Sequence, residues 1–129
     1  SLGKLYSDTF YQNLKSVLNK NAVVAVQSTS PFFAPKSFWC VNKTIKSVFK
    51  RTIPYHVYLP SFGEWGFCLA TVSSFKNIKY RTLNNLKFYN YSFEEHTNFA
   101  KDMIVEDVEL NKLNNQKLVN YFNKEWSSY

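Results

Sequence analysis

Hydrophobic and polar positions separate most sharply at residues 22–34. Residues 22–26 (AVVAV) form an unbroken apolar run, which is typical of a strand buried on both faces. Four polar residues (QSTS) follow at once, and then Pro31 and two phenylalanines. In a parallel α/β sheet, ligands bind beside the loops that follow the carboxyl ends of the strands. We therefore expect a ligand crevice at the end of this run.

Helical spacing predicts a helix on each side of that strand. Ser7 is suited to cap a helix over residues 8–18, because its hydroxyl can accept a hydrogen bond from a free backbone N–H. A second helix begins at Pro35, since proline has no N–H to satisfy in a first turn. Trp39 and Cys40 lie off its apolar stripe. That stripe, which we expect to face the sheet, comprises Phe38, Val41, Ile45 and Val48.

Two strands are predicted next, at residues 53–59 (IPYHVYL) and 66–72 (GFCLATV). The gap between them is too short for a helical crossover, so the pair is expected to be antiparallel. Pro54 places the first of them at an edge of the sheet. The connecting loop, residues 59–66 (LPSFGEWG), is expected to reach the same edge as the loop after Gln27.

The C-terminal part gives two further helix predictions. Ser92 to Glu95 reads as a capping box, which predicts a helix through Asp102. A last helix is predicted over residues 115–126, with Leu118, Phe122 and Trp126 on one face. Residues 75–91 are basic, aromatic and rich in asparagine, and they fit neither periodicity.

Charge is distributed unevenly along the 129 residues, which are enough for one domain or part of one. The net charge is +7, and residues 1–63 contain eight lysines or arginines but a single acid, Asp8. A solvated basic face or an acidic partner domain would explain this pattern. Nucleic-acid binding through residues 75–91 is a weaker alternative, because the lysines are scattered and form no known binding motif. The sequence contains no apolar stretch long enough to span a membrane.

The residue types that carry chemistry form no complete catalytic set. Three glycines are too few for a phosphate-binding loop, and no histidines, cysteines and acids have metal-ligand spacing. Cys40 and Cys68 are expected to be buried free thiols, which suits a reducing, cytoplasmic location. We interpret His56 as a structural histidine within a strand, and His96 as a surface or helix-capping residue. The acidic residues between 102 and 109 are expected to be solvated.

Two side chains in the central stretch have alternatives that the pattern leaves open. Gln27 carries donors and an acceptor at the expected crevice, so it is suited either to bind a ligand or to hold its own loop. Glu64 lies between a glycine and a tryptophan. It either faces a cationic ligand beside an aromatic wall or is exposed at a loop tip.

Four segments carry a resemblance to a known family. They are LYSDTFYQNL, VVAVQSTSPFFAPKSFWCV, PYHVYLPSFGEWGF and AKDMIVEDVELNKLNNQKLVNYF. Together they resemble the polyamine aminopropyltransferases (spermidine synthases), and most of all a bacterial branch in which this domain follows membrane helices. The resemblance covers nearly the whole chain but only the C-terminal half of the family's catalytic domain. Because the chain opens on Ser1 rather than Met, we expect a piece of a longer protein.

The resemblance implies an α/β fold, namely the C-terminal half of a Rossmann-like sheet of the class I methyltransferase type. Its last parallel strand would be residues 22–27, with the strand near 66–72 inserted antiparallel beside it, followed by C-terminal helices. The chain would form a single partial domain, with the sheet and its helices in residues 1–74 and a C-terminal extension in 75–129. The family transfers an aminopropyl group from decarboxylated S-adenosylmethionine to putrescine.

The same resemblance implies roles for five residues. Leu5 matches a leucine near the adenine pocket of the cosubstrate, and Gln27 matches a glutamine that holds the diamine. Phe62 stands where many members have a diamine-contacting tyrosine. Glu64 and Trp65 belong to the GEWG pattern of this branch and are expected, with Gln27 and Phe62, to be substrate-binding residues. The catalytic aspartate and the glycine-rich cosubstrate loop would precede the chain. We therefore expect neither a catalytic residue nor a bound cofactor in it.

Two functional hypotheses follow. In the first, the chain is the C-terminal part of an aminopropyltransferase and is inactive without the rest. In the second, it is a non-catalytic binding or assembly module with the same fold. The resemblance implies that the missing half supplies the parallel neighbour of residues 22–26, so we expect this edge to be free and the chain to self-associate through it or through uncovered apolar helix faces. We also expect partly uncovered helix faces at Phe10, Leu14, Phe38 and Val41.

Overall fold

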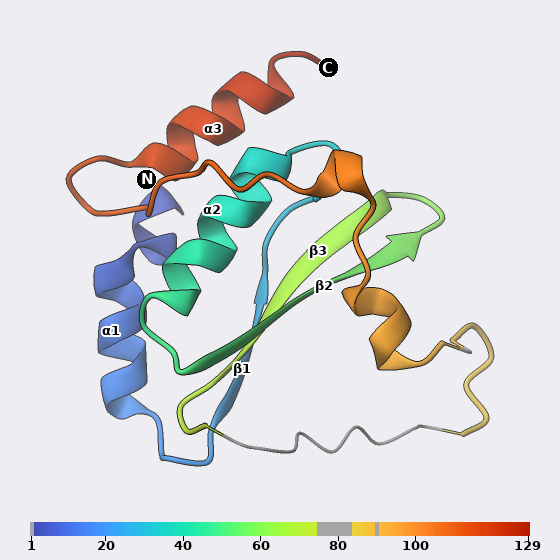
Figure 1. The fold of residues 1–129 in the computed structure, drawn as a ribbon, viewed down its shortest axis with the longest axis horizontal. Coiled ribbons are helices and arrows are strands. Elements are labelled where there is room, and N and C mark those ends of the chain that lie inside the picture. Colours follow the sequence, from blue (N-terminus) through green and yellow to red (C-terminus); the bar gives the residue numbers. More distant parts are fainter. Residues whose placement is uncertain (1, 75–83, 90) are drawn as a thin grey trace.

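A small sheet with helices on one side makes up the structure, a computed structural model that describes residues 2–74, 84–89 and 91–129. The sheet has three strands in the spatial order β1, β3, β2. Helices α1, α2 and α3 lie on one side of it (Figure 1). The elements in chain order are the 3₁₀ helix η1 (Leu2–Tyr6), α1 (Asp8–Val17), β1 (Val23–Gln27), α2 (Pro35–Lys46), β2 (Arg51–Leu59), β3 (Gly63–Thr71), the 3₁₀ helices η2 (Phe93–Thr97) and η3 (Lys101–Met103), and α3 (Lys117–Trp126).

The topology confirms the predicted α/β arrangement. Strand β3 is antiparallel to β1 and to β2, so β1 and β2 run parallel to each other with α2 as their connection. Val26 lies opposite Cys68 on one side of β3, and Pro54 lies opposite the same cysteine on the other. The late strand is thus inserted beside residues 22–27, and Pro54 belongs to an outer strand, both as predicted.

Helix α1 begins where its capping residue indicates. The Ser7 hydroxyl accepts a hydrogen bond from the Phe10 N–H at 3.2 Å and donates one to the Lys4 carbonyl at 2.8 Å. The Asp8 N–H is satisfied from far along the chain, because it donates to the Asn111 carbonyl at 3.0 Å. The Ser7 side chain thus connects η1 to α1, and Asn111 satisfies a further N–H group at the start of α1.

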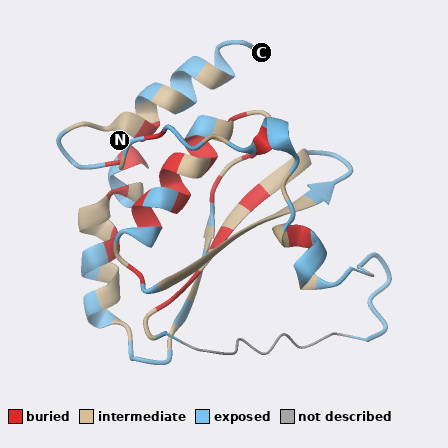
Figure 2. Ribbon diagram, viewed as in Figure 1, coloured by how far each residue is buried: buried red, intermediate tan, exposed pale blue. Residues whose placement is uncertain are grey.

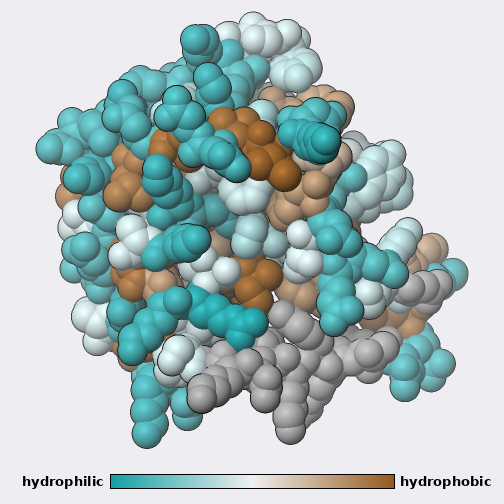
Figure 3. All heavy atoms as spheres, in the orientation of Figure 1, coloured by the Kyte–Doolittle hydropathy of each residue, from teal (hydrophilic) through white to brown (hydrophobic). Residues whose placement is uncertain are grey.

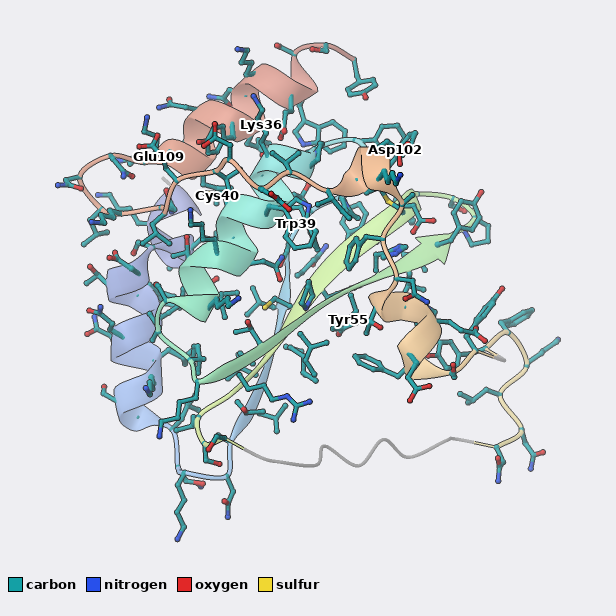
Figure 4. The ribbon with its side chains drawn as sticks, in the orientation of Figure 1. Lys36, Trp39, Cys40, Tyr55, Asp102 and Glu109 are labelled. Atoms are coloured by element: carbon teal, nitrogen blue, oxygen red, sulfur yellow. The ribbon has the colours of Figure 1, made fainter. Side chains whose placement is uncertain are left out.

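Helix α2 is the centre of the core, and it is buried on more sides than predicted (Figure 2). Phe38 and Val41 are 0% and 2% exposed, so the expectation that they are partly uncovered is wrong. Cys40 lies off the predicted stripe and is fully buried, which confirms the prediction of a buried free thiol. The reason is that residues 99–108 cross the outer side of α2, where the Trp39 indole N–H donates to the Met103 carbonyl at 2.6 Å (Figure 4).

Strand β1 is buried on one face only, which corrects the prediction of two buried faces. Val24 and Val26 pack against the core, whereas Val23 is 57% exposed and both Ala25 and Gln27 are exposed. The apolar run predicts two covering layers, and within the described residues the helices cover only one face of this strand. The other face of β1 and its outer edge remain open there.

The predicted helix from Ser92 to Asp102 is wrong. The chain forms two short 3₁₀ turns, η2 and η3, joined by extended residues, and Ser92 makes no side-chain capping bond. Tertiary contacts interrupt the helix: the Phe99 ring packs 5.2 Å from Trp39 and 4.6 Å from His56 between ring centroids. These contacts are made from an extended backbone, and a continuous helix would direct the Phe99 ring away from Trp39 and His56.

His96 is also placed differently from its prediction. Its side chain is buried rather than exposed, and Nε2 lies 2.9 Å from the Tyr89 hydroxyl. Tyr91 packs edge-on against the same imidazole.

The acidic residues Asp102 and Glu109 are exposed as predicted (Figure 4). Most of residues 75–91 lie outside the described part of the chain.

Gly66 in β3 is expected to tolerate no side chain. A methyl group there would lie 2.5 Å from the Phe38 ring and 2.7 Å from the Thr29 carbonyl oxygen. Gly66→Ala should therefore lower the free energy of unfolding by about 1–3 kcal/mol, because a well-packed core must shift to admit it. Urea unfolding measures this, with Ser61→Ala in the exposed hairpin turn as the control. Equal stability of the two variants would contradict the crowding at Gly66.

The two core cysteines are expected to be unreactive in the folded protein. Burial raises the pKa of the Cys40 and Cys68 thiols to about 12 each, because the charged thiolate is poorly solvated there. At pH 8 both therefore remain protonated. A colorimetric disulfide reagent should label neither until urea is added and both afterwards. Rapid labelling of the folded chain at pH 8 would show that one thiol is accessible.

Candidate functional site

The loop after β1 lies directly against the β2–β3 hairpin. The Ser28 N–H donates to the Gly66 carbonyl at 2.8 Å, and the Gly66 N–H donates to the Thr29 carbonyl at 2.6 Å. Thr29 adopts a left-handed backbone conformation with φ of 60°. These bonds turn the chain away from the sheet at the end of β1. The two loops predicted to meet at one edge of the sheet are therefore in contact.

The rest of this loop forms a tight turn into α2. The Ser30 hydroxyl accepts hydrogen bonds from the Phe32 and Phe33 N–H groups, at 3.3 and 3.2 Å. The Ala34 N–H donates to the Ser30 carbonyl at 2.9 Å. Phe33 also covers Gly63, whose φ of 76° requires glycine. The loop is thus fixed at both ends and along its length.

A cavity of about 430 Å³ lies beside this loop, between η1, the end of β1, α2 and α3. Its walls are mostly apolar, and the polar groups come from the QST segment after the strand. It therefore has the character of a small-molecule site, an apolar pocket with a few convergent polar groups. The lining residues are Gly3, Tyr6, Gln27, Ser28, Thr29, Val41, Leu118, Val119 and Phe122.

The structure brings together only some of the residues predicted for the site. Gln27 lines the cavity, together with Gly3 and Tyr6 of η1. Leu5, in the same 3₁₀ helix, is 50% exposed and does not line it. Phe62 and Trp65 form a separate pair near the tip of the hairpin, with ring centroids 6.0 Å apart. The predicted residues therefore occupy two neighbouring places, the cavity and the hairpin tip.

Glu64 is not exposed at a loop tip, because its carboxylate pairs with a neighbouring histidine. The predicted loop of residues 59–66 is shorter, because β3 already begins at Gly63 and Glu64 pairs with Tyr58 across the hairpin. Its carboxylate Oε2 lies 2.7 Å from His56 Nδ1, and the two side chains are 26% and 12% exposed. The other His56 nitrogen faces the Asn98 carbonyl. The pair therefore ties the hairpin to the segment that follows η2, and the structural interpretation of His56 is confirmed.

The cavity wall supplied by α3 was not predicted from the sequence. Leu118, Val119 and Phe122 approach the end of β1 from almost a hundred residues further along the chain. The spacing of Leu118 and Phe122 indicates an amphipathic helix, but periodicity does not say which surface such a helix covers. Within the described residues there is no cluster suited to hold a metal ion, and no helix long and apolar enough to cross a membrane.

Hydrophilic side chains cover much of the surface around these elements. On the face shown in Figure 3, apolar residues form separate patches between hydrophilic ones. Among the described residues that line the cavity, none carries a carboxylate, an imidazole or an amine. The arrangement can thus contact an apolar group through most of its lining and a polar group through residues 27–29. These described lining residues therefore supply no carboxylate or histidine as a general base.

Comparisons with known proteins agree on one family. The spermine/spermidine synthase domain matches residues 2–82. A polyamine aminopropyltransferase of Leptospira interrogans is 46% identical over 128 residues, which is 98% of this chain and 26% of that protein. Polyamine aminopropyltransferase 2 of Ralstonia nicotianae is 43% identical over 131 residues, with 98% and 25% covered. The chain thus spans about a quarter of the length of these relatives.

Solved structures support the fold. The crystal structure of spermidine synthase from Thermotoga maritima matches with a TM-score of 0.51 and 20% sequence identity. The match covers 97% of this chain and 40% of that one. A spermidine synthase in complex with the transition-state analogue AdoDATO matches equally well. These neighbours have a Rossmann-like sheet, which agrees with the fold described above. Because the domain match covers more than half of the chain, the chain belongs to the spermine/spermidine synthase family.

Proposed function

We propose that this chain is the C-terminal part of a polyamine aminopropyltransferase. The intact enzyme would transfer an aminopropyl group from decarboxylated S-adenosylmethionine to putrescine or a similar diamine. The observation that carries the proposal is the match of nearly the whole chain to relatives named for this activity, at up to 46% identity. The cavity beside Gln27 lies at the carboxyl end of β1, where ligands of this sheet type bind.

The chemistry explains why the chain needs further residues. A neutral amine nitrogen attacks the carbon next to the sulfonium, the C–S bond breaks, and its electron pair remains on sulfur as a neutral thioether. The new ammonium then loses a proton to a base, for which a carboxylate is suited. None of the cavity residues carries a carboxylate. The base and the anionic groups for a dicationic diamine would come from the rest of the enzyme.

The residues of this chain would bind and orient the substrates. We assign the Gln27 amide to the diamine, because Gln27 lines the cavity and its amide offers an acceptor as well as two donors. Phe62 and Trp65 would supply an aromatic wall at the hairpin tip, with Glu64 holding that tip through His56. Leu5, exposed beside the cavity, would contact the adenine of the cosubstrate. The AdoDATO complex of a matched spermidine synthase supports an adenosyl cosubstrate.

A cytoplasmic location is part of the same proposal. Cys40 and Cys68 are both free thiols, which suits a reducing compartment. Attachment of this domain to membrane helices in the longer protein rests on the sequence resemblance alone. An assembly module without activity is the alternative, and turnover by the longer protein decides between the two.

Gln27→Ala in the longer protein should weaken use of the diamine. Loss of an amide that bonds an ammonium group removes about 1–3 kcal/mol of binding free energy. Steady-state kinetics with putrescine measures this, with Gln12→Ala on the exposed side of α1 as the matched control.

This chain alone should show no transfer, because its cavity holds no base. Turnover by the isolated chain would contradict the proposed division of roles.

An unchanged KM for putrescine in Gln27→Ala would show that the amide only holds its loop.

The free edge of β1 gives the isolated chain a further property. The Ala22 carbonyl accepts from the Val72 N–H, and the Ser28 N–H donates to the Gly66 carbonyl, so both groups point toward β3. Hydrogen-bonding directions alternate along a strand, so the N–H and C=O groups of residues 23, 25 and 27 point to the opposite edge. Among the described residues no strand pairs with that edge, and β1 contains neither lysine nor proline to protect it. Such an edge is a template for pairing with another copy.

We therefore expect the isolated chain to self-associate at micromolar concentration. Ala25→Lys should reduce this, since a charged side chain at the middle of the edge opposes pairing, while Ser61→Lys adds the same charge elsewhere. Sedimentation velocity separates the species. A monomer of 15.2 kDa for the unmodified chain would rule out association through this edge.

A further inference from the structure

Helix α2 is capped by a side chain from α3. Ala34 occupies its N-cap position and makes no side-chain hydrogen bond. The Glu125 carboxylate takes over this role, accepting from the Lys36 N–H at 2.6 Å and the Ser37 N–H at 3.1 Å. The Ser37 hydroxyl also donates to it at 2.7 Å. The carboxylate thus satisfies two free N–H groups at the positive end of the α2 dipole.

Aromatic contacts also join the end of α3 to the loop that leads into α2. The Phe33 ring, two residues before α2, lies 6.2 Å from Trp126 and 5.4 Å from Tyr129 between ring centroids. Lys36, at the start of α2, lies beside α3 (Figure 4). The end of α3 therefore holds both the start of α2 and the last part of the loop that leads into it.

The opposite end of α3 forms part of the cavity. Leu118 and Phe122 line it from one side, and Gln27 with the two following residues lines it from the other. Glu125 lies one turn beyond Phe122 on this helix. A shift of α3 would thus change the cavity wall and the loop together. The domain match ends at residue 82, so it does not include this helix.

We propose that α3 is a positioning element of the substrate site and that Glu125 is its positioning residue. The Glu125 carboxylate fixes the start of α2, and through it the loop of residues 28–34 and the cavity wall that faces Gln27. Glu125 does not line the cavity and so acts through these neighbours. This inference rests on the proposed aminopropyltransferase function, but its structural part can be tested without turnover.

The kinetic test uses Glu125→Gln in the longer protein. An amide keeps the size of the side chain but removes the charge and one acceptor, so the loop should be held less firmly. We expect the KM for putrescine to rise roughly three- to tenfold, because capping interactions are of that size, with kcat within about twofold. Glu109→Gln is the matched control, since that carboxylate pairs with Lys117 at the other end of α3 rather than with the start of α2.

Hydrogen–deuterium exchange of the same proteins separates positioning from a general loss of stability. Peptides that contain residues 28–38 should exchange at least about threefold faster in Glu125→Gln, while β3 peptides remain unchanged. Glu109→Gln should alter neither. Equally faster exchange in residues 28–38 and in β3 would overturn the assignment, and so would unchanged exchange in both. Faster exchange in residues 28–38 with an unchanged KM for putrescine would overturn it as well. Absence of turnover in the unmodified protein would refute the proposed function, and the exchange result would still decide whether Glu125 holds the loop.

Discussion

The close approach of Gly66 to the loop after β1 determines the arrangement of this molecule. Its N–H bonds the Thr29 carbonyl, its carbonyl accepts from Ser28, and the space for a side chain is taken by the Phe38 ring. Because β3 lies between β1 and β2, this contact sets where β1 ends and where the hairpin stands. It also directs the chain into α2. A glycine in the sheet thus brings a strand, a loop and a helix together beside the cavity.

Local patterns in the sequence were sufficient to predict where α1 and α2 begin and how the β2–β3 hairpin pairs. Ser7 marks the start of α1, Pro35 the start of α2, and the short gap before β3 requires an antiparallel hairpin. Each of these rests on backbone geometry or hydrogen bonding within a few residues. The resemblance to a family added the order of the strands, which periodicity does not contain.

The features that the sequence did not reveal depend on contacts between distant segments. The capping box at Ser92 is overridden because Phe99 packs on α2 and the Asn98 carbonyl is bound by His56. Glu64 is paired rather than exposed because the hairpin continues further than its glycines suggest. For the site, the position of Gln27 was predicted, whereas the wall from α3 was not. An apolar stripe shows that a helix is buried, but not against which partner.

The sequence separation of the Glu125 cap has a consequence for folding. The bonds from Glu125 to Lys36 and Ser37 join residues 89 and 88 positions apart, and such a contact closes a long loop of chain. The entropic cost of that closure favours late formation, after the β2–β3 hairpin, whose two strands are close in sequence. During synthesis the start of α2 would therefore remain uncapped until α3 has emerged from the ribosome. The loop beside the cavity would be among the last parts of this region to become ordered.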